Sequence, residues 1–405
     1  MEPKMIRPGI YAVGAVDWDR RLFDSLIPLP DGTSYNSYLV KGSQKTALID
    51  TVDPTKKSVL MQHLQELSIT SLEYIIAHHA EQDHSGALPE VIRQYPEAKI
   101  VVSTRCKPML MDLLHIPEKQ FLEVQDGETL SLGDRTLKFI YTPWVHWPET
   151  MVTYMPEEKI LFSCDFFGSH LATTELYVTD EGQVHESAKR YFAEIMMPFR
   201  VNIEKNLEKI KSIDIGLIAP SHGPVYDRPE FITSLYRSWV FDESKNLAVI
   251  AYVSMHDSTR EMVRYLTEAL GRKDVEVQQF DLTVSDPGKL AMSLVDATTL
   301  VLGTPTVLAG PHPLAAYAAF LANALRPKLK YATIIGSYLW GGKTVEVIKN
   351  LIPNLNVELF PPVVIKGLPR TEDYAALEKL AETIAEKHRI LPARSAWHIL
   401  RSEKR

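Results

Sequence analysis

Residues 75–86 read IIAHHAEQDHSG and place four possible metal ligands directly after an apolar run. A lone histidine is more often structural than ligating, but four ligands within six residues are harder to explain that way. Burying two imidazoles and two carboxylates together is costly unless a cation neutralises the carboxylates. The stretch therefore predicts a metal site built from His79, Glu81, Asp83 and His84.

Three more candidate ligands stand where other strand-like runs end. His146 lies in TPWVHWPET, Asp165 in FSCDFFG and His222 in APSHGP. Together with the first four residues they give four histidines and three carboxylates. That set is large enough for two metal ions that share one carboxylate.

The elements that must position these ligands are short strands with helices between them. SYNSYLVKGSQKTALIDTV predicts a hairpin, and SVLMQHLQEL has the apolar spacing of a helix. The runs LEYIIAHH, AKIVVST, LKFIYTP and IGLIAPSHG predict strands, and MVTYMPEEKILFSCDFF predicts a second hairpin. We expect a loop leaving a strand to carry residues 79–84, because a helix does not aim positions 79, 81 and 83 at one point.

This ligand pattern resembles that of the metallo-β-lactamase superfamily, whose first motif is normally His-x-His-x-Asp-His. Glu81 replaces the second imidazole of that motif. Imidazole-rich sites suit zinc, whereas mixed histidine and carboxylate sites with open positions suit iron. The resemblance implies that His79, Glu81 and His146 bind one iron, that Asp83, His84 and His222 bind the other, and that Asp165 bridges the two.

Several neighbours of the ligands have two readings. Tyr191 and His170 are candidates for a catalytic role beside the metals, and ordinary structural roles explain them equally well. His78 does not fit the ligand pattern, so we expect a structural or surface role. Cys164 alternates away from the ligand face of its strand, which predicts a buried and inert thiol.

Beyond a boundary placed at about residue 246, apolar strands alternate with amphipathic helices, which predicts a doubly wound parallel sheet. Helices are expected over about 259–270, 288–296 and 314–325 and from about 343. Three loops at the carboxyl ends of strands suit a flavin mononucleotide (FMN), since hydroxyl groups, glycines and a helix N-terminus favour phosphate and close ring approach. Their candidate binding residues are Ser254, Met255, His256, Asp257, Ser258, Thr259, Pro305, Thr306, Val307, Leu308, Ser337, Tyr338, Leu339, Trp340, Gly341 and Gly342. The region resembles flavodoxin, with departures at Asp257 and Leu339, where glycine is common.

The two halves together resemble the flavodiiron proteins, also called A-type flavoproteins. The resemblance implies a metallo-β-lactamase-like αββα sandwich over residues 1–246 and a flavodoxin-like domain over 247–390, and the residues that follow, 391–405, form a basic tail by their composition. It further implies FMN and two irons per chain, reduction of dioxygen to water and/or nitric oxide to nitrous oxide, and a head-to-tail homodimer or dimer of dimers. The chain carries no cysteine pairs of a fused rubredoxin, so electrons are expected from separate rubredoxin or reduced F420.

Composition limits the alternatives. The 405 residues suit two domains, and the net charge of −7 argues against nonspecific binding to nucleic acid or an anionic membrane. No long apolar stretch or signal peptide is visible, and there are only two cysteines, so we expect a cytoplasmic protein. Two rivals stay open: a dizinc hydrolase with an appended flavodoxin domain, and an electron-transfer flavoprotein whose metal domain is structural.

Overall fold

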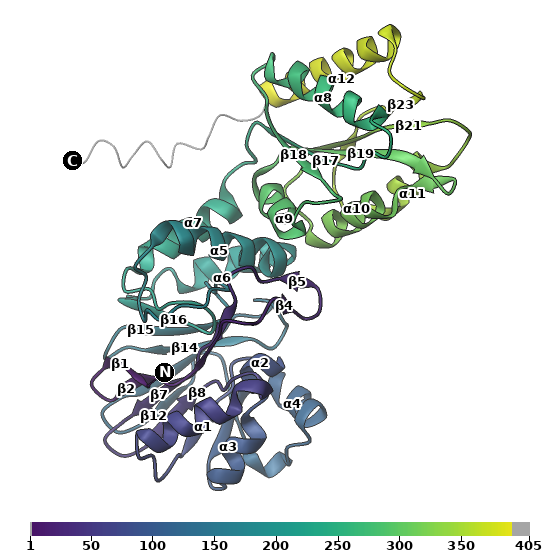
Figure 1. Ribbon diagram of the computed structural model, residues 1–405. Helices are drawn as coiled ribbons and strands as arrows, with labels where there is room; N and C mark the ends of the chain where they lie inside the picture. Colours follow the sequence, from purple (N-terminus) through teal and green to yellow (C-terminus); the bar gives the residue numbers. More distant parts are fainter. Residues whose placement is uncertain (1, 391–405) are drawn as a thin grey trace, which may run out of the picture. The chain divides into compact units, whose positions relative to one another are not determined.

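The computed structural model describes residues 2–390, so the expected basic tail 391–405 lies outside the described residues. The chain divides into two compact units (Figure 1). The first runs to Phe192 and resumes over Phe199–Val240, and the second takes Ala193–Pro198 and the residues from Phe241 on. The expected boundary at about 246 falls just before the first strand of the second unit, which begins at Leu247.

Two sheets form the middle of the first unit. The larger sheet has seven strands, in the order β1 (Lys4–Arg7), β2 (Ile10–Ala12), β7 (Tyr38–Lys41), β8 (Thr46–Ile49), β9 (Tyr74–Ile76), β10 (Lys99–Ser103) and β11 (Phe121–Val124). The other has five, in the order β12 (Thr129–Ser131), β13 (Thr136–Tyr141), β14 (Met151–Met155), β15 (Ile160–Cys164) and β16 (Leu217–Pro220). Both predicted hairpins are confirmed, since β7 pairs antiparallel with β8 and β14 with β15.

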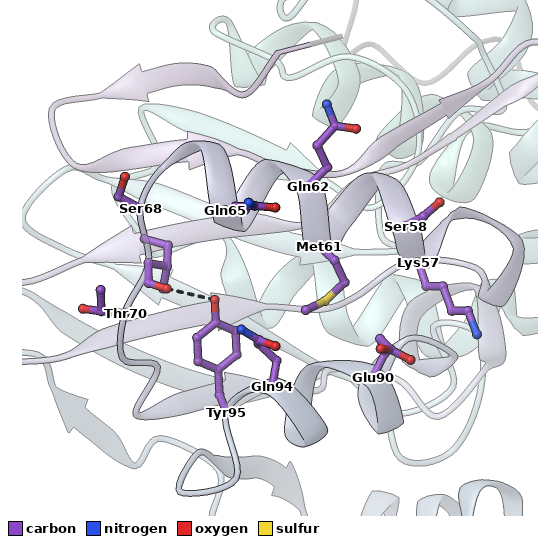
Figure 2. A pocket seen from close by; sticks show the side chains of 11 residues that line it. Lys57, Ser58, Met61, Gln62, Gln65, Ser68, Thr70, Glu90, Gln94 and Tyr95 are labelled. Carbon is purple, nitrogen blue, oxygen red and sulfur yellow. Dashed lines mark hydrogen bonds between the residues drawn. The ribbon is translucent and has the colours of Figure 1, made fainter.

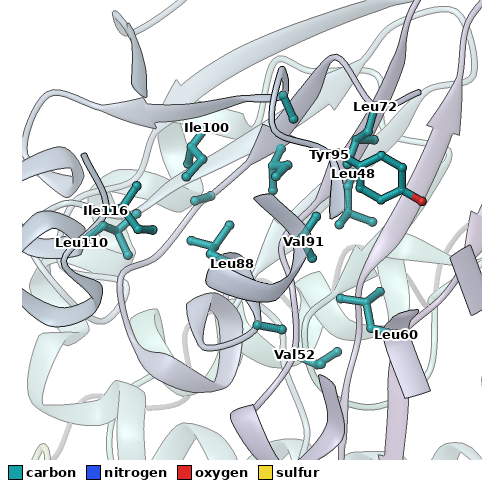
Figure 3. Close-up of a cluster of buried hydrophobic side chains, with 14 of the residues drawn as sticks. Leu48, Val52, Leu60, Leu72, Leu88, Val91, Tyr95, Ile100, Leu110 and Ile116 are labelled. Carbon is teal, nitrogen blue, oxygen red and sulfur yellow. The ribbon is translucent and has the colours of Figure 1, made fainter. Parts of the chain in front are cut away.

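Alternation of side chains along the strands assigns the two faces of the larger sheet. Leu48 of β8 packs into an outer cluster with Leu60 and Val91, which lie on the helices α1 (Lys57–Glu66) and α3 (Leu88–Gln94) (Figure 3). A further helix, α4 (Cys106–Leu114), adds Leu110 to this cluster. The neighbouring Ile49 packs instead between the two sheets, in an inner cluster that includes residues of β13 to β16. Because successive side chains of a strand point to opposite faces, the single strand β8 contributes to both the outer and the inner cluster.

Three helices lie along the outer side of the five-stranded sheet (Figure 1): α5 (Glu181–Tyr191), α6 (Arg200–Ile210) and α7 (Pro229–Phe241). A π-helical turn, Phe192–Met196, and a 3-10 turn, Met197–Phe199, join α5 to α6. The small pairs β3 (Ala15–Asp17) with β6 (Thr33–Tyr35), and β4 (Leu22–Phe23) with β5 (Ile27–Pro28), complete the strands of this unit. The layers are helix, sheet, sheet and helix, which confirms the predicted αββα sandwich.

The second unit is a doubly wound sheet. Its main strands lie in the order β18 (Glu276–Asp281), β17 (Leu247–Tyr252), β19 (Thr299–Val307), β21 (Tyr331–Tyr338) and β22 (Glu358–Leu359), with β23 (Val363–Lys366) also parallel to β21 and β20 (Gly310–Pro311) paired with β19. This order of parallel strands is that of flavodoxin-like folds and confirms the predicted class.

Helices cover both faces of this sheet. One buried cluster joins the sheet to α8 (Ser258–Gly271) and α12 (Thr371–Arg389). The other joins it to α9 (Pro287–Asp296), α10 (Pro313–Leu325) and α11 (Thr344–Leu351). Successive residues of β17 alternate between these clusters: Ile250 packs with the first and Val249 and Ala251 with the second. None of the helices in residues 2–390 has the length and apolar character needed to cross a membrane.

A surface cleft of about 580 Å³ lies beside α1 and α3 (Figure 2). Its lining includes Met61, Gln65 and Gln94, and the Tyr95 hydroxyl donates a hydrogen bond to the Ile69 carbonyl at 3.1 Å. None of the seven predicted metal ligands lines this cleft. It is therefore separate from the metal chemistry predicted from the sequence.

Candidate metal centre and flavin edge

The ligand motif leaves β9 as a loop and then forms one helical turn. His79 and Glu81 lie in the loop, whereas Asp83 and His84 lie in α2 (Gln82–Ser85). The prediction that a loop carries all four was therefore only half right. Glu81 has extended dihedral angles at the start of α2 (φ −58°, ψ 143°), and this bend lets the loop and helix ligands face a common point.

The other three ligands also leave the ends of strands. His146 lies between β13 and β14, and Asp165 follows β15 directly. The last residue of β15, Cys164, has a φ of 53°, which turns the chain off the strand just before Asp165. His222 follows β16 and precedes Gly223, whose φ is 82°. Left-handed backbone at these two points aims both ligands inward.

One group of ligand atoms brings together His79, Glu81, His146 and Asp165. The Glu81 Oε2 atom lies 3.1 Å from the Nε2 atoms of both His79 and His146. The Asp165 Oδ2 atom lies 3.6 Å from His79 Nε2 and 3.5 Å from His146 Nε2. Two atoms bound at about 2.1 Å to one metal lie about 3.0–3.4 Å apart at angles of about 90–110°. The spacing of this group is close to that range.

A second group brings together Asp83, His84 and His222. The Asp83 Oδ1 atom lies 3.4 Å from His84 Nε2, and the Asp83 Oδ2 atom lies 3.1 Å from His222 Nε2. The Asp165 Oδ1 atom lies 3.1 Å from His84 Nε2 and 3.3 Å from His222 Nε2. Asp165 therefore turns one carboxylate oxygen toward each group, which is the arrangement of a bridging ligand.

The chemistry of this pocket fits two cations. Among residues 2–390, both oxygens of Asp83, the His84 Nε2 atom and the Asp165 Oδ2 atom are buried without a hydrogen-bond partner. Such orphaned atoms are costly unless a metal occupies the space they face. Burial opposes positive charge on His146 and His222, yet the neighbouring carboxylates, Asp165 first among them, raise their pKa to about 9 and about 10. These seven residues could hold two metal ions.

Hydrogen bonds behind the imidazoles fix how they face the centre. The His79 Nδ1 atom lies 2.6 Å from Glu149 Oε1, and the Ala80 amide donates to the same oxygen at 3.1 Å. Burial opposes ionisation of Glu149, but the hydrogen bond with His79 lowers its pKa. His222 Nδ1 donates to the Ser34 carbonyl at 2.7 Å. Glu149 was not predicted from the sequence, where its position three residues after His146 was the one signal for it.

Tyr191 and His170 both reach the centre. The Tyr191 hydroxyl, at the end of α5, donates to Asp165 Oδ1 at 2.8 Å, and its ring lies 4.9 Å from that of His170. His170 Nδ1 lies 2.8 Å from Thr33 Oγ1, while its Nε2 atom is buried without a partner among the described residues. Burial holds the pKa of His170 well below its usual range, so its ring is neutral.

His78 and Cys164 lie behind the centre. His78 donates to Asp50 Oδ2 through Nδ1 at 2.8 Å and lies 2.7 Å from Thr153 through Nε2, so its role is structural. The Cys164 sulfur lies 3.8 Å from His84 Nδ1, and burial raises the pKa of this thiol well above its usual range. A buried and protonated thiol agrees with the expectation from the sequence.

A carboxylate that the sequence analysis missed also approaches the centre. Asp24 lies in the turn between β4 and β5 with a φ of 50°. Burial raises the pKa of Asp24 to about 6, and the negative charge of Glu81 and a hydrogen bond with it add to this shift. The adjacent Phe23 packs its ring 5.1 Å from that of His170. No spacing in the sequence links this turn to ligands more than fifty residues away.

The three predicted flavin loops lie at one edge of the second unit. The strands β17, β19 and β21 are parallel neighbours, so their carboxyl ends share an edge, and Thr259 and Ser337 approach within 3.5 Å. The second loop is shorter than expected, because β19 runs to Val307 and turns through Leu308 and Ala309 into β20. Pro305, Thr306 and Val307 are thus strand residues, which corrects the prediction of a loop there.

This edge has the features that a planar aromatic cofactor requires. Three of its apolar side chains are largely exposed: Leu308 at 88%, Leu339 at 71% and Trp340 at 66%. A cleft of about 580 Å³ beside them is lined in part by Thr306, Tyr338, Gly341 and Gly342. A Cβ atom on Gly342 would come within 2.6 Å of Thr306 Cγ2. The residues present therefore fit FMN, which buries a ring against such side chains.

The departure at Asp257 is compensated by a nearby cation. Asp257 has a φ of 63° at the start of α8, and its side chain makes no capping hydrogen bond. Its carboxylate pairs instead with Arg260, which also lies 3.5 Å from Asp281. The carboxylate at the predicted phosphate loop is therefore paired with a cation of the chain itself.

Comparison with known proteins agrees with this geometry. Residues 33–223 match the model of the ODP family beta lactamase. The chain is 35% identical to a nitric oxide reductase from Moorella thermoacetica, over 95% of this chain and 99% of that protein. Rubredoxin oxygen:oxidoreductase from Desulfovibrio gigas superposes with a TM-score of 0.91 at 30% identity, covering 96% of this chain and 98% of the other. The flavodiiron protein from Giardia intestinalis gives a TM-score of 0.87 at 26% identity, with coverage of 96% and 98%. The chain belongs to the flavodiiron (type A flavoprotein) family.

Proposed function

We propose that this protein is an oxidoreductase that passes electrons from an external donor through FMN to a diiron site, where dioxygen is reduced to water and/or nitric oxide to nitrous oxide. The observation that carries the proposal is the pair of ligand groups joined by Asp165 on a chain that also presents a flavin-type edge. Family membership supports the same conclusion, with relatives named for each of the two gases.

Seven side chains would hold the irons. His79, Glu81 and His146 would bind one, Asp83, His84 and His222 the other, and Asp165 both. When bound, two ferrous ions supply two electrons and open positions for a diatomic gas. The chain surrounds this space with buried side chains, which keep bulk water away and strengthen every electrostatic contact.

Proton supply falls to groups beside the ligands. The Tyr191 hydroxyl donates a hydrogen bond to Asp165 Oδ1, and burial raises its pKa well above the usual range, so it holds a proton beside the ligands. His170 is neutral and aromatic contacts place its ring 4.9 Å from that of His222. These two residues are our candidates for catalytic groups.

The flavin would lie at the edge of the second unit. Ser254 to Thr259 would contact the phosphate at the start of α8, and Tyr338, Trp340 and the Leu308 turn would contact the ring. FMN supplies two electrons, which with two ferrous ions match the needs of dioxygen reduction. The donor would be rubredoxin or reduced F420. A cytoplasmic location and a head-to-tail homodimer or dimer of dimers, as the family resemblance implies, complete the proposal.

The dizinc hydrolase is the alternative. A hydrolase would use metal-bound hydroxide as nucleophile, and a flavin edge would then have no task. Glu81 also stands where a zinc site of this kind has an imidazole. The second rival, an electron-transfer flavoprotein with a structural metal domain, predicts that gas reduction survives loss of the metals.

Metal and flavin analysis joined to gas reduction tests the proposal. We expect about two irons and one FMN per chain, and rapid oxidation of the reduced protein by dioxygen, nitric oxide or both in anaerobic stopped-flow. His79→Ala and Asp165→Ala should abolish gas consumption, while His115→Ala, at an exposed histidine that ends α4, should not. Stoichiometric zinc with esterase or nuclease activity, or gas reduction that survives loss of iron, would refute the proposal.

A further inference from the structure

The two ligand groups are equivalent in the atoms that face the centre. Each has two imidazoles, one carboxylate of its own and one oxygen of Asp165. Two irons held this way receive the same ligand types and the same formal charge. Any difference between the irons must therefore come from the groups that hydrogen-bond to the ligands.

One group has an additional anion behind it. His79 Nδ1 donates to Glu149 Oε1 at 2.6 Å, and both side chains are buried. A carboxylate on the far nitrogen makes an imidazole a stronger electron donor, and the dry surroundings strengthen this effect. A strong donor stabilises the ferric ion.

In the described part of the chain, the imidazoles of the other group contact neutral atoms through their far nitrogens, and a hydroxyl withdraws charge from the carboxylate oxygen that faces them. His222 Nδ1 donates to a neutral carbonyl, and His84 Nδ1 meets the Cys164 sulfur only at 3.8 Å. The Tyr191 hydroxyl donates to Asp165 Oδ1, the oxygen that faces these two histidines. That hydrogen bond reduces the negative charge available to a metal on this side. A weaker donor set stabilises the ferrous ion.

We propose that Glu149 and Tyr191 make the two irons electronically unequal, so that a centre holding one electron is ferric at His79, Glu81 and His146 and ferrous at Asp83, His84 and His222. The inference rests on the proposed function, because it requires iron in both groups. With iron in both groups, the residues of the Asp83 group would favour the first electron supplied by FMN, and those of the His79 group would take the second. In setting the two potentials, Glu149 and Tyr191 act through the ligands they contact, as positioning residues, and this effect is separate from the proton supply proposed above for Tyr191.

The test is an anaerobic redox titration without gas, followed by electron paramagnetic resonance of the one-electron-reduced state and by Mössbauer spectroscopy. Glu149→Gln should raise the potential of the second reduction step, and Tyr191→Phe should lower that of the first. A tenfold change in the ferric-to-ferrous ratio corresponds to about 59 mV, and each variant should shift its own step by about this amount. Each substitution reduces the difference between the potentials of the first and second reduction steps, and the double variant should reduce this difference most. In Mössbauer spectra Glu149→Gln should change the ferric component and Tyr191→Phe the ferrous one.

A matched control is available in the same unit. Tyr226→Phe removes a buried hydroxyl that donates to the Phe167 carbonyl and changes no charge. This variant should move neither potential. The inference is overturned if Glu149→Gln and Tyr191→Phe shift both steps equally, shift neither, or match the control. A parent protein without two irons would instead refute the proposed function, so the two failures are distinguishable.

Discussion

Gly223 offers a direct test of how the backbone places one ligand. It follows His222 with a φ of 82°, and a Cβ atom there would lie 2.0 Å from Ser169 Oγ and 2.8 Å from the Ser169 carbonyl oxygen. The change Gly223→Ala must therefore move either Ser169 or the chain that carries His222. Movement of His222 would separate its Nε2 atom from Asp83 and Asp165, which lie 3.1 and 3.3 Å away.

Gly127 supplies the matched control. Its φ is 84°, but nothing lies within 4 Å of the Cβ position. Alanine at either site incurs the left-handed backbone cost of about 1–2 kcal/mol. Only Gly223→Ala adds overpacking, which costs typically about 1–3 kcal/mol more. We expect Gly223→Ala to lower the free energy of unfolding by about that extra amount relative to Gly127→Ala.

Chemical denaturation of the metal-free proteins measures the stability difference, and iron analysis after competition with a chelator measures the effect on the ligand. Gly127→Ala should keep two irons per chain, whereas Gly223→Ala should approach one. Adding Ser169→Ala should recover part of the loss, because it removes the closer of the two contacts. Equal stability and equal iron retention in the two glycine variants would refute the reasoning.

Three further predictions follow from the charges of the two sites. In the metal-free protein the pKa values of His146 and His222 are raised to about 9 and about 10, so their protonation stabilises the fold. This stabilisation is complete below about pH 6.5, the usual histidine pKa, and is lost as pH rises through about 9–10. The melting temperature of the metal-free form should therefore fall between about pH 6.5 and 10, and a melting temperature that does not change with pH would contradict the assignment. Metal requires neutral imidazole, so iron affinity, measured by chelator competition, should rise from pH 6 to pH 8; an affinity independent of pH would count against histidine ligation. Arg260→Ala should leave Asp257 unpaired beside the phosphate and weaken FMN binding in fluorescence titrations, and Asp257→Ala in the same chain should restore it; unchanged FMN affinity in Arg260→Ala would show that the pair lies away from the phosphate.

The fold and the ligand types could be predicted because they depend on local patterns. Apolar runs predict strands such as β8 and β17. In the second unit, strands that alternate with helices predict a parallel sheet. His146, Asp165 and His222 were recognisable because each follows a strand. The structure brings them together with the motif at residues 79–84, as expected from sheets whose strand ends share an edge.

The features that the sequence did not reveal depend on contacts between distant segments. Glu149 and Asp24 are ordinary carboxylates in the sequence, and only folding places them on His79 and Glu81. Tyr191 could be named as a candidate, but its hydrogen bond to Oδ1 of Asp165 depends on how folding places the end of α5. The end of β19 was misjudged because Gly303 and Pro305 look like loop residues, although the strand continues through them.

The metal and flavin content of the purified protein, followed by anaerobic mixing of the fully reduced form with each gas, decides whether this chain is a diiron gas reductase. We expect about two irons and one FMN per chain, with flavin and iron reoxidised by dioxygen or nitric oxide within a single turnover. A protein that carries zinc in place of iron, or whose reduced flavin is untouched by both gases while iron is present, would contradict it.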